Sequence, residues 1–197
     1  MNKKVKKGLI EYGILGAVAL TLYLTGLHTP IIGFLQQGLL QTGLFRPTTE
    51  EINEATTLHP NPPADFSLQL RNAAGEEVTL EEFRGKVIFI NFWTTWCPPC
   101  IAEMPGINKL YQDLQAEEVV FLMVSLDDDF EKARRFQEKK GFDFDVYQPS
   151  GRLPAMYRSQ SIPTTFVIDA RGGLALTQSG MADYDTQEFR EFLRRLQ

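Results

Sequence analysis

Two continuous apolar runs, each followed by a helical pattern, constrain the fold of this chain more than any other feature of its sequence. VIFINFW fills residues 87–93, and VVFLMVSL fills residues 119–126. Apolar runs without polar alternation are typical of strands that are covered on both faces of a sheet. Because a helical pattern separates the two runs, the sequence predicts a parallel β-α-β unit.

The segments that follow these runs carry signals for helix starts and ends. Two prolines come directly after Cys97, and apolar residues then recur at helical spacing, so a helix is expected to run to about residue 116. The next helix is expected to begin after Asp129, a favourable capping residue, and to end at Gly141. The acidic run at 127–129 is interpreted as the loop before that helix, with a binding role as the alternative.

Shorter elements flank this unit. FSLQL and EEVTL surround an Asn-Ala-Ala-Gly turn, and TFVID and LALTQ surround Ala-Arg-Gly-Gly, so two antiparallel hairpins are expected. A last helix should follow the capping-box pattern Asp185-x-x-Glu188. One face of this helix is apolar, with Phe189, Phe192, Leu193 and Leu196. The predicted fold class is α/β, a mixed central sheet flanked by helices with an N-terminal β-hairpin.

The amino terminus is expected to anchor the chain in a membrane. Four lysines within residues 3–7 precede an apolar stretch at 9–27, in which Glu11 is the only charged residue. A span of this kind needs roughly 20 residues, and no small-x-small cleavage site follows it. We therefore expect a cytoplasmic tail at 1–8 and a retained, single transmembrane helix at 9–27, with the rest of the chain outside the cytoplasm.

Residues 28–60 are expected to connect this anchor to a folded domain at 61–197. The uncharged part at 31–45 is too polar for a second span, and it is interpreted either as an amphipathic helix on the outer membrane surface or as a plain linker. The part at 46–63 is polar and rich in proline, which is typical of a tether. The net charge of −5 offers no basic stripe for phosphates, so nucleic-acid binding is not expected.

Cys97 and Cys100 are the only cysteines among the 197 residues. A disulfide between them would close almost no loop, so a structural staple is disfavoured. A structural zinc site needs four ligands, whereas the two histidines, His28 and His59, lie before the predicted domain. Redox chemistry remains, and no metal or separate cofactor is expected beyond a redox-active Cys97–Cys100 disulfide.

The position of the pair suits that chemistry. Cys97 lies where an apolar strand gives way to a helix, whose unpaired N–H groups and dipole favour a thiolate. Pro98 and Pro99 suit the first helical positions. We interpret Cys97 as the nucleophile and Cys100, one turn along and less exposed, as the resolving cysteine.

The motif WCPPC after an apolar strand, the segment Ile162-Pro163-Thr164 and the entry PPADFSLQL resemble the thioredoxin superfamily, more closely its membrane-anchored TlpA/ResA-like branch, over about 61–197. The resemblance implies a thioredoxin-like fold and protein thiol–disulfide oxidoreductase activity. It also implies that Pro163 is cis and faces the disulfide, and that Ile162 offers its backbone to the substrate. The alternative for Pro163 is a trans proline that opens an edge strand.

Residues near the cysteines refine the predicted mechanism. Glu103 matches the glutamate of CxxCxxE in ResA-like proteins, so we expect partial burial, a raised pKa and acceptance of the Cys100 proton, with an ordinary solvated carboxylate as the alternative. Asn91 occupies the place of a buried aspartate in cytoplasmic thioredoxins, so a buried proton acceptor must lie elsewhere. Trp96 is expected either to shield Cys97 and pack against substrates or to fill the core. Pro105 should kink the helix.

The leading functional interpretation is a membrane-anchored, extracytoplasmic oxidoreductase that exchanges disulfides with proteins through Cys97. One alternative is a thiol peroxidase of the same superfamily, for which Thr94 fits the expected pattern but Ile90 replaces its proline. Another is a copper chaperone, which would use a longer cysteine spacing and a distal histidine. The direction of exchange stays open.

The resemblance also implies partners and a location. The partners are protein substrates and a DsbD- or CcdA-like membrane electron donor, and cytochrome c biogenesis is one family role. The catalytic domain would face the periplasm or the cell exterior from the cytoplasmic membrane.

Overall fold

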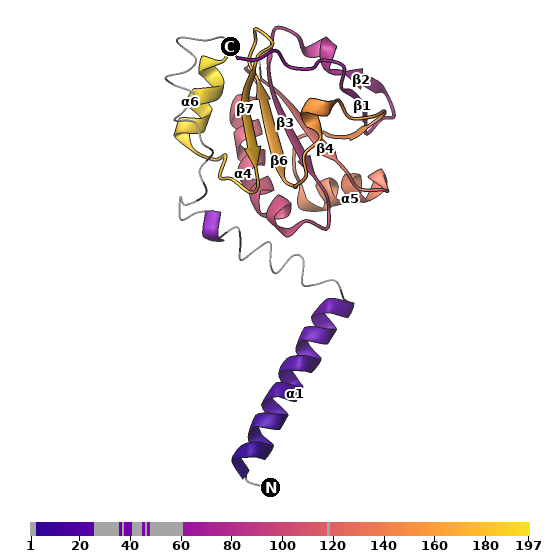
Figure 1. The fold of residues 1–197 in the computed structure, drawn as a ribbon, viewed down its shortest axis with the longest axis vertical. Helices are drawn as coiled ribbons and strands as arrows, with labels where there is room; N and C mark the ends of the chain where they lie inside the picture. The colour runs from indigo at the N-terminus through magenta and orange to yellow at the C-terminus, as the bar shows by residue number, and fades with distance from the viewer. Residues whose placement is uncertain are drawn as a thin grey trace.

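The computed structural model of the protein describes residues 3–25, 36, 38–40, 45, 47, 61–117 and 119–197. Among these residues, one sheet with helices around it forms the main body, and a separate helix, α1, lies towards the amino terminus (Figure 1). The sheet has the strand order β2-β1-β5-β4-β3-β6-β7. The strands are β1 (Gln69–Asn72), β2 (Glu77–Thr79), β3 (Val87–Trp93), β4 (Val119–Ser125), β5 (Val146–Pro149), β6 (Thr164–Ile168) and β7 (Leu174–Ser179).

The sheet is mixed, as the sequence predicts. β4 runs parallel to β3 and to β5, whereas β3–β6, β6–β7, β1–β2 and β1–β5 are antiparallel pairs. The two expected hairpins are confirmed, and the first one turns at Gly75, whose φ of 86° is readily adopted only by glycine. All seven residues of the central strand β3 are buried.

Helical segments account for most of the remaining described structure. They are α1 (Lys3–Leu24), η1 (Leu80–Phe83), α4 (Pro98–Leu114), α5 (Phe130–Lys140), η2 (Ala155–Tyr157) and α6 (Gln187–Arg195). Asp129 caps α5 by accepting a hydrogen bond from the Glu131 N–H, and Gly141 ends it in the left-handed conformation, as predicted. Pro105 lies inside α4, and the kink expected there stays a prediction.

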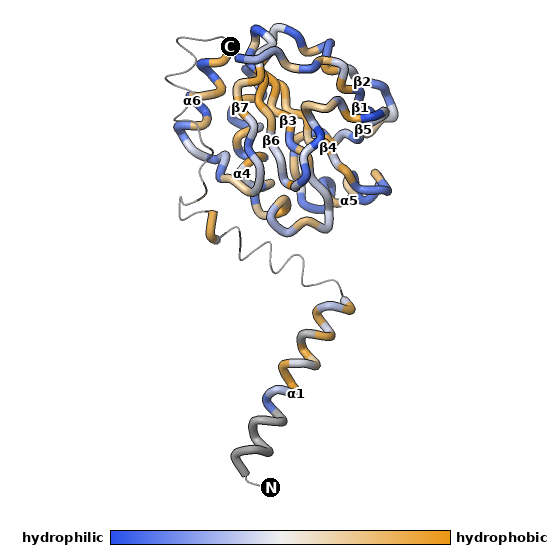
Figure 2. Tube along the Cα trace, in the orientation of Figure 1, coloured by the Kyte–Doolittle hydropathy of each residue, from blue (hydrophilic) through white to orange (hydrophobic). Residues whose placement is uncertain are grey.

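Two hydrophobic clusters occupy the two faces of the sheet. Alternate residues of β3 point to opposite faces, so Phe89 and Trp93 join the cluster under α4, α5 and α6, whereas Ile88 and Phe92 join the cluster under η1 and η2. The strands at the centre of the sheet are correspondingly the most hydrophobic part of the domain in Figure 2. Both cysteines belong to the cluster under the three helices.

Two expectations about the fold are wrong. Strand β5 was not expected, because its sequence VYQP is short, half polar and ends in proline, yet it pairs with both β4 and β1. The predicted Asp185–Glu188 capping box does not form. Thr186 caps α6 instead, by accepting a hydrogen bond from the Phe189 N–H at 3.1 Å. The Asp185 carboxylate instead forms ion pairs with Lys109 and Arg190.

Helix α1 overlaps most of the stretch predicted to be a membrane anchor. Within the part of the chain that the structure describes, no helix combines the length and the apolar character needed to cross a bilayer. Most of the predicted connector at 28–60 lies outside the described residues. The anchor, the amphipathic helix at 31–45 and the domain boundaries therefore stay predictions.

Candidate redox site

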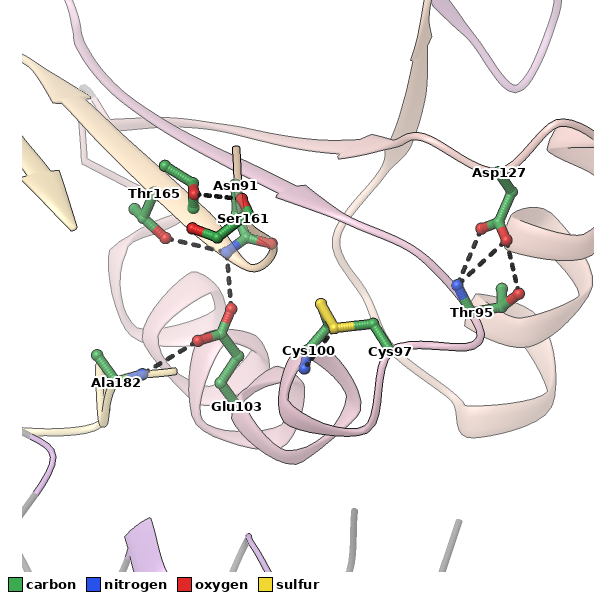
Figure 3. Close-up of a disulfide and its surroundings, with 10 residues drawn as sticks. Asn91, Thr95, Cys97, Cys100, Glu103, Asp127, Ser161, Thr165 and Ala182 are labelled. Carbon is green, nitrogen blue, oxygen red and sulfur yellow. Dashed lines mark hydrogen bonds between the residues drawn. A yellow bond between two sulfur atoms is a disulfide. The ribbon is translucent and has the colours of Figure 1, made fainter. Parts of the chain in front are cut away.

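Cys97 and Cys100 form a disulfide at the amino-terminal end of α4 (Figure 3). Cys97 is the capping residue of that helix, and its Sγ accepts a hydrogen bond from the Cys100 N–H at 3.3 Å. Pro98 and Pro99 occupy the first helical positions, where a missing N–H costs nothing. The sulfur of Cys97 thus occupies the place of a capping oxygen, where helix N–H groups stabilise negative charge.

The two cysteines are buried, whereas the residue directly before them is exposed. Cys97 is 3% exposed and Cys100 is fully buried, in the order expected for a nucleophile and a resolving cysteine. Trp96, directly before Cys97, is 65% exposed. The alternative that Trp96 fills the core is therefore wrong, and its contact with substrates stays a prediction.

The Ile162–Pro163 peptide bond is cis, which is the geometry that the family resemblance implied. Pro163 directly precedes β6, and β6 pairs with β3, the strand that leads into the cysteines. Ile162 packs against the hydrophobic cluster that contains Cys97 and Cys100. The structure thus brings these two residues to the redox site, and their role in binding a substrate stays a prediction.

Glu103 is the buried carboxyl group of the site. It lies three residues after Cys100 on α4 and is 2% exposed, so its burial is more complete than expected and a solvated carboxylate is excluded. Its Oε1 accepts a hydrogen bond from Asn91 Nδ2 at 2.8 Å, and its Oε2 accepts one from the Ala182 N–H at 3.2 Å (Figure 3). Burial raises the pKa of Glu103 to about 8, although both hydrogen bonds act in the opposite direction.

Asn91 connects Glu103 to the strand that follows Pro163. Besides Glu103, its Nδ2 binds Thr165 Oγ1 at 2.9 Å, and the Tyr184 hydroxyl donates to the same oxygen at 2.7 Å. Burial, with the nearby Glu103 charge, raises the pKa of Tyr184 well above its usual range, so this phenol stays a donor. The sequence predicts that any buried proton acceptor lies at a position other than 91. In the structure the buried acid is Glu103, and its carboxyl group accepts a hydrogen bond from Asn91. The involvement of Thr165 and Tyr184 carried no sequence signal.

Asp127 fixes the loop that leads into Cys97, a function that was not expected for it. Its carboxylate accepts hydrogen bonds from the Thr95 N–H at 3.0 Å, from the Thr95 hydroxyl at 2.8 Å and from the Ser125 hydroxyl at 2.9 Å. The signal that could have revealed this is strand register. β3 and β4 are parallel with Trp93 opposite Ser125, so the residues two positions further on, Thr95 and Asp127, emerge together.

Further polar groups lie beside the cysteines without a partner. Thr94 is 1% exposed, and its hydroxyl makes no hydrogen bond within the structure; the same is true of the Trp93 indole N–H. Buried groups of this kind are uncommon in folded proteins, and a catalytic role is one explanation for them. Across the described ranges, no cluster of three or more histidine, cysteine, aspartate or glutamate side chains is arranged to hold a metal ion.

Comparison with known proteins agrees with this geometry. A family model described as the AhpC/TSA family matches residues 61–177. The thiol-disulfide oxidoreductase ResA of Halalkalibacterium halodurans is 32% identical over 127 residues, which are 64% of this chain and 72% of the relative. The ResA of Geobacillus thermodenitrificans is 38% identical over 104 residues, which are 52% of this chain and 60% of that protein.

Solved structures share the fold. A protein described as the thiol:disulfide interchange protein DsbE of Chlorobium tepidum matches with a TM-score of 0.57 and 27% identity, over 71% of this chain and 95% of that one. StoA of Bacillus subtilis matches with a TM-score of 0.53 and 26% identity, over 70% of this chain and 98% of that one. Both similarities cover about 70% of this chain rather than the whole of it.

Proposed function

The chain belongs to the AhpC/TSA family and is a thiol–disulfide oxidoreductase of the TlpA/ResA-like part of the thioredoxin superfamily, and on that premise we propose that it reduces disulfide bonds of proteins outside the cytoplasm. The observation that carries the proposal is the Cys97–Cys100 disulfide at the start of α4, with Glu103 buried three residues further on. A thiol–disulfide oxidoreductase needs an attacking thiolate, a resolving thiol and a group that accepts the proton of that thiol.

The first step uses the end of the helix. In the reduced protein, Cys97 is the thiolate, because the N–H groups of the first turn of α4 favour its negative charge. Its Sγ attacks one sulfur of the substrate disulfide. A mixed disulfide forms between Cys97 and the substrate, and the other substrate sulfur leaves as a thiolate that takes a proton from water.

The second step uses the buried carboxyl group. Cys100 gives its proton to Glu103 and attacks the Sγ of Cys97, which releases the second substrate sulfur as a thiolate. The Cys97–Cys100 disulfide forms, the substrate gains two electrons, and the protein loses the same two. Cys100 and Glu103 are neighbours along one side of α4, because residues three apart on a helix lie on the same face.

The protonation of Glu103 supports this assignment. The structure holds the oxidised pair, and in this state burial raises the pKa of Glu103 to about 8, so the carboxyl group keeps a proton at neutral pH. Resolution by Cys100 would produce the same state, with the disulfide formed and Glu103 protonated. When an electron donor reduces the disulfide, the reverse transfer returns the proton to Cys100 and regenerates the carboxylate for the next turnover.

The proposed substrate-binding groups lie around the nucleophile. Trp96 has an exposed ring directly before Cys97, and Ile162 and the cis Pro163 directly precede strand β6, which pairs with β3. Extended peptides commonly bind by pairing with exposed backbone groups, while a nearby apolar side chain adds contact area. We assign Trp96, Ile162 and Pro163 to contact with the protein substrate.

The proposed location follows from the amino-terminal sequence. The lysines within residues 3–7 would remain in the cytoplasm, the stretch at 9–27 would cross the membrane once, and the redox domain would face the periplasm or the cell exterior. A dithiol outside the cytoplasm needs a source of electrons. We propose that a membrane carrier of the DsbD or CcdA type supplies them.

A trapping experiment in cells tests the proposal. The Cys100→Ala variant cannot resolve, so mixed disulfides on Cys97 should accumulate, and their partners can be identified after non-reducing electrophoresis. The Cys97→Ser, Cys100→Ala double variant is the matched control, because serine can still cap α4 but leaves no sulfur to trap. If the single variant captures no more protein than the double variant, exchange with protein disulfides loses its support.

Thr94 keeps a thiol peroxidase as the second candidate. Its buried hydroxyl, three residues before Cys97, has no hydrogen-bond partner within the described structure and could serve a bound peroxide. Purified reduced protein separates the two functions. An oxidoreductase reduces a protein disulfide such as that of insulin faster than it consumes hydrogen peroxide, and a peroxidase shows the opposite order.

A further inference from the structure

A cavity lies directly behind the buried carboxyl group of Glu103. Its volume is about 140 Å³. Glu103 lines it together with neighbours on α4, with Ala182, Asp183 and Asp185, and with one residue from the distant amino-terminal segment, Leu40. Glu103 is only 2% exposed, so this cavity is a place from which water could reach its carboxyl group if the cover were removed.

The cover includes the amino-terminal segment. Leu40 is 5% exposed and lines the cavity, although Leu39, next to it, is 49% exposed. The carbonyl oxygen of Phe45 accepts a hydrogen bond from the Asp183 N–H at 2.7 Å. An apolar side chain and a backbone hydrogen bond thus attach this segment to the domain, although it lies more than 100 residues before the start of β6. Figure 1 shows the short helical piece around residue 40 close to the domain.

One short stretch of backbone connects this attachment to the redox site. The N–H of Ala182 donates to Glu103 Oε2 at 3.2 Å, and the next N–H along the chain, that of Asp183, donates to Phe45. Two consecutive amide groups therefore hold the buried carboxyl group on one side and the amino-terminal segment on the other.

We propose that the surface formed by residues 102–109 of α4 and by Ala182, Asp183 and Asp185 is a docking site for the amino-terminal segment that carries Leu40 and Phe45, and that docking covers the cavity behind Glu103. With Leu40 in this position, Glu103 is only 2% exposed. Undocking would admit water, which solvates the carboxylate and so releases the proton at a lower pH. Only the link between this release and thiol exchange rests on the proposed function.

The other titratable groups described around Glu103 belong to the domain and not to the amino-terminal segment. Tyr184 faces it from the 180–186 connection, and Lys109 on α4 lines the cavity with Asp183 and Asp185. Lys109 and Asp185 are paired at 3.1 Å, and Asp185 also binds Arg190. The variable element is the segment that bears Leu40, so substitutions there separate docking from the charges of the site.

The test compares Leu40→Ser with Leu39→Ser in the full-length, oxidised protein. Hydrogen–deuterium exchange at the Asp183 amide reports docking directly, whether or not the protein reduces any substrate. Leu40→Ser should speed this exchange by about tenfold or more, because it removes the buried apolar side chain, whereas Leu39→Ser should leave it unchanged. The conservative Leu40→Met should keep the protection. Equal exchange in the two serine variants would overturn the docking site.

A titration tests the effect on Glu103. Carbon-13 NMR of the Glu103 side-chain carboxyl group should give a midpoint at least half a pH unit lower in Leu40→Ser than in wild type, and an unchanged midpoint in Leu39→Ser. If the Asp183 amide exchanges faster in Leu40→Ser but the midpoint of Glu103 is unchanged, the proposal that the segment covers the cavity is overturned. Both measurements remain informative if the protein proves to reduce no protein disulfide.

Discussion

Two carboxylates lie near the disulfide, and they are built into the structure in opposite ways. Asp127 is partly exposed, and its oxygens accept hydrogen bonds from Thr95 and Ser125. Glu103 is buried, and each of its oxygens accepts one hydrogen bond, from Asn91 or from Ala182. The first carboxylate is held by donors close to solvent, and the second depends on donors in an apolar interior.

The difference shows how environment, rather than residue type, gives two carboxyl groups near one disulfide different properties, and we propose that only Glu103 carries a proton. Loss of water around Glu103 outweighs the two hydrogen bonds that favour its charge, so burial raises its pKa to about 8. Asp127 accepts three hydrogen bonds close to solvent, and these bonds hold the loop before Cys97. We therefore expect the loss of each group to give a different signature.

The largest expected effect is kinetic and belongs to Glu103. Glu103→Gln keeps the side-chain shape but removes the proton acceptor, so resolution of a Cys97 mixed disulfide should slow by roughly 100-fold or more near neutral pH. Its pH dependence near 8 should also disappear. Stopped-flow measurement of mixed-disulfide decay between pH 6 and 9 checks this. Superimposable profiles for the variant and wild type would remove Glu103 from the mechanism.

The second effect concerns stability and follows from the sign of the pKa shift. The folded protein holds a proton on Glu103 up to about pH 8, whereas the unfolded chain loses it near 4.5. Between these values the folded state binds more protons, so its unfolding free energy should fall as pH rises, by up to about 1.4 kcal/mol per pH unit from this group. Urea unfolding at pH 5, 6, 7 and 8 should show this slope in wild type.

The matched control is the same series on Glu103→Gln. An amide does not titrate, so the slope should be shallower in this variant, and its stability relative to wild type should increase with pH. Parallel curves for the two proteins would mean that Glu103 titrates alike in the folded and unfolded states.

The smallest effect belongs to Asp127. Asp127→Ala leaves the Thr95 N–H and hydroxyl without their acceptor, which should lower the unfolding free energy by about 1–2 kcal/mol and slow the attack of Cys97 several-fold. The pH profile of resolution should keep its wild-type shape, because the Glu103 environment is untouched. Asp128→Ala, which removes a neighbouring exposed carboxylate, is the control. A shifted profile in Asp127→Ala would abolish the distinction between the two carboxylates.

The sequence predicts the parts of this site that depend on local pattern. The apolar run that becomes β3, the prolines that open α4 and the cap at Asp129 are all encoded within a few residues, and the structure confirms them. The nucleophile and resolving cysteine follow from their spacing at a strand-to-helix junction. The cis bond before Pro163 follows from family resemblance alone.

The parts that could not be predicted depend on contacts between distant segments. Thr95 meets Asp127 only because β3 and β4 align in parallel, and Tyr184 reaches Thr165 only after β6 and the connection to α6 are in place. The expected cap at Asp185 failed for the same reason, since Lys109 lies 76 positions away in sequence. The depth at which Glu103 is buried is also a property of the whole fold.

The capping position of Cys97 has a practical consequence for work on this protein. The Sγ of Cys97 belongs to the disulfide and also caps helix α4. A variant without this atom therefore changes both the redox chemistry and the start of the helix. Serine is a strong capping residue, whereas alanine is a poor one. A redox-inactive form that preserves the helix start is therefore Cys97→Ser, and any difference between it and Cys97→Ala measures how far the local backbone relies on that one side chain.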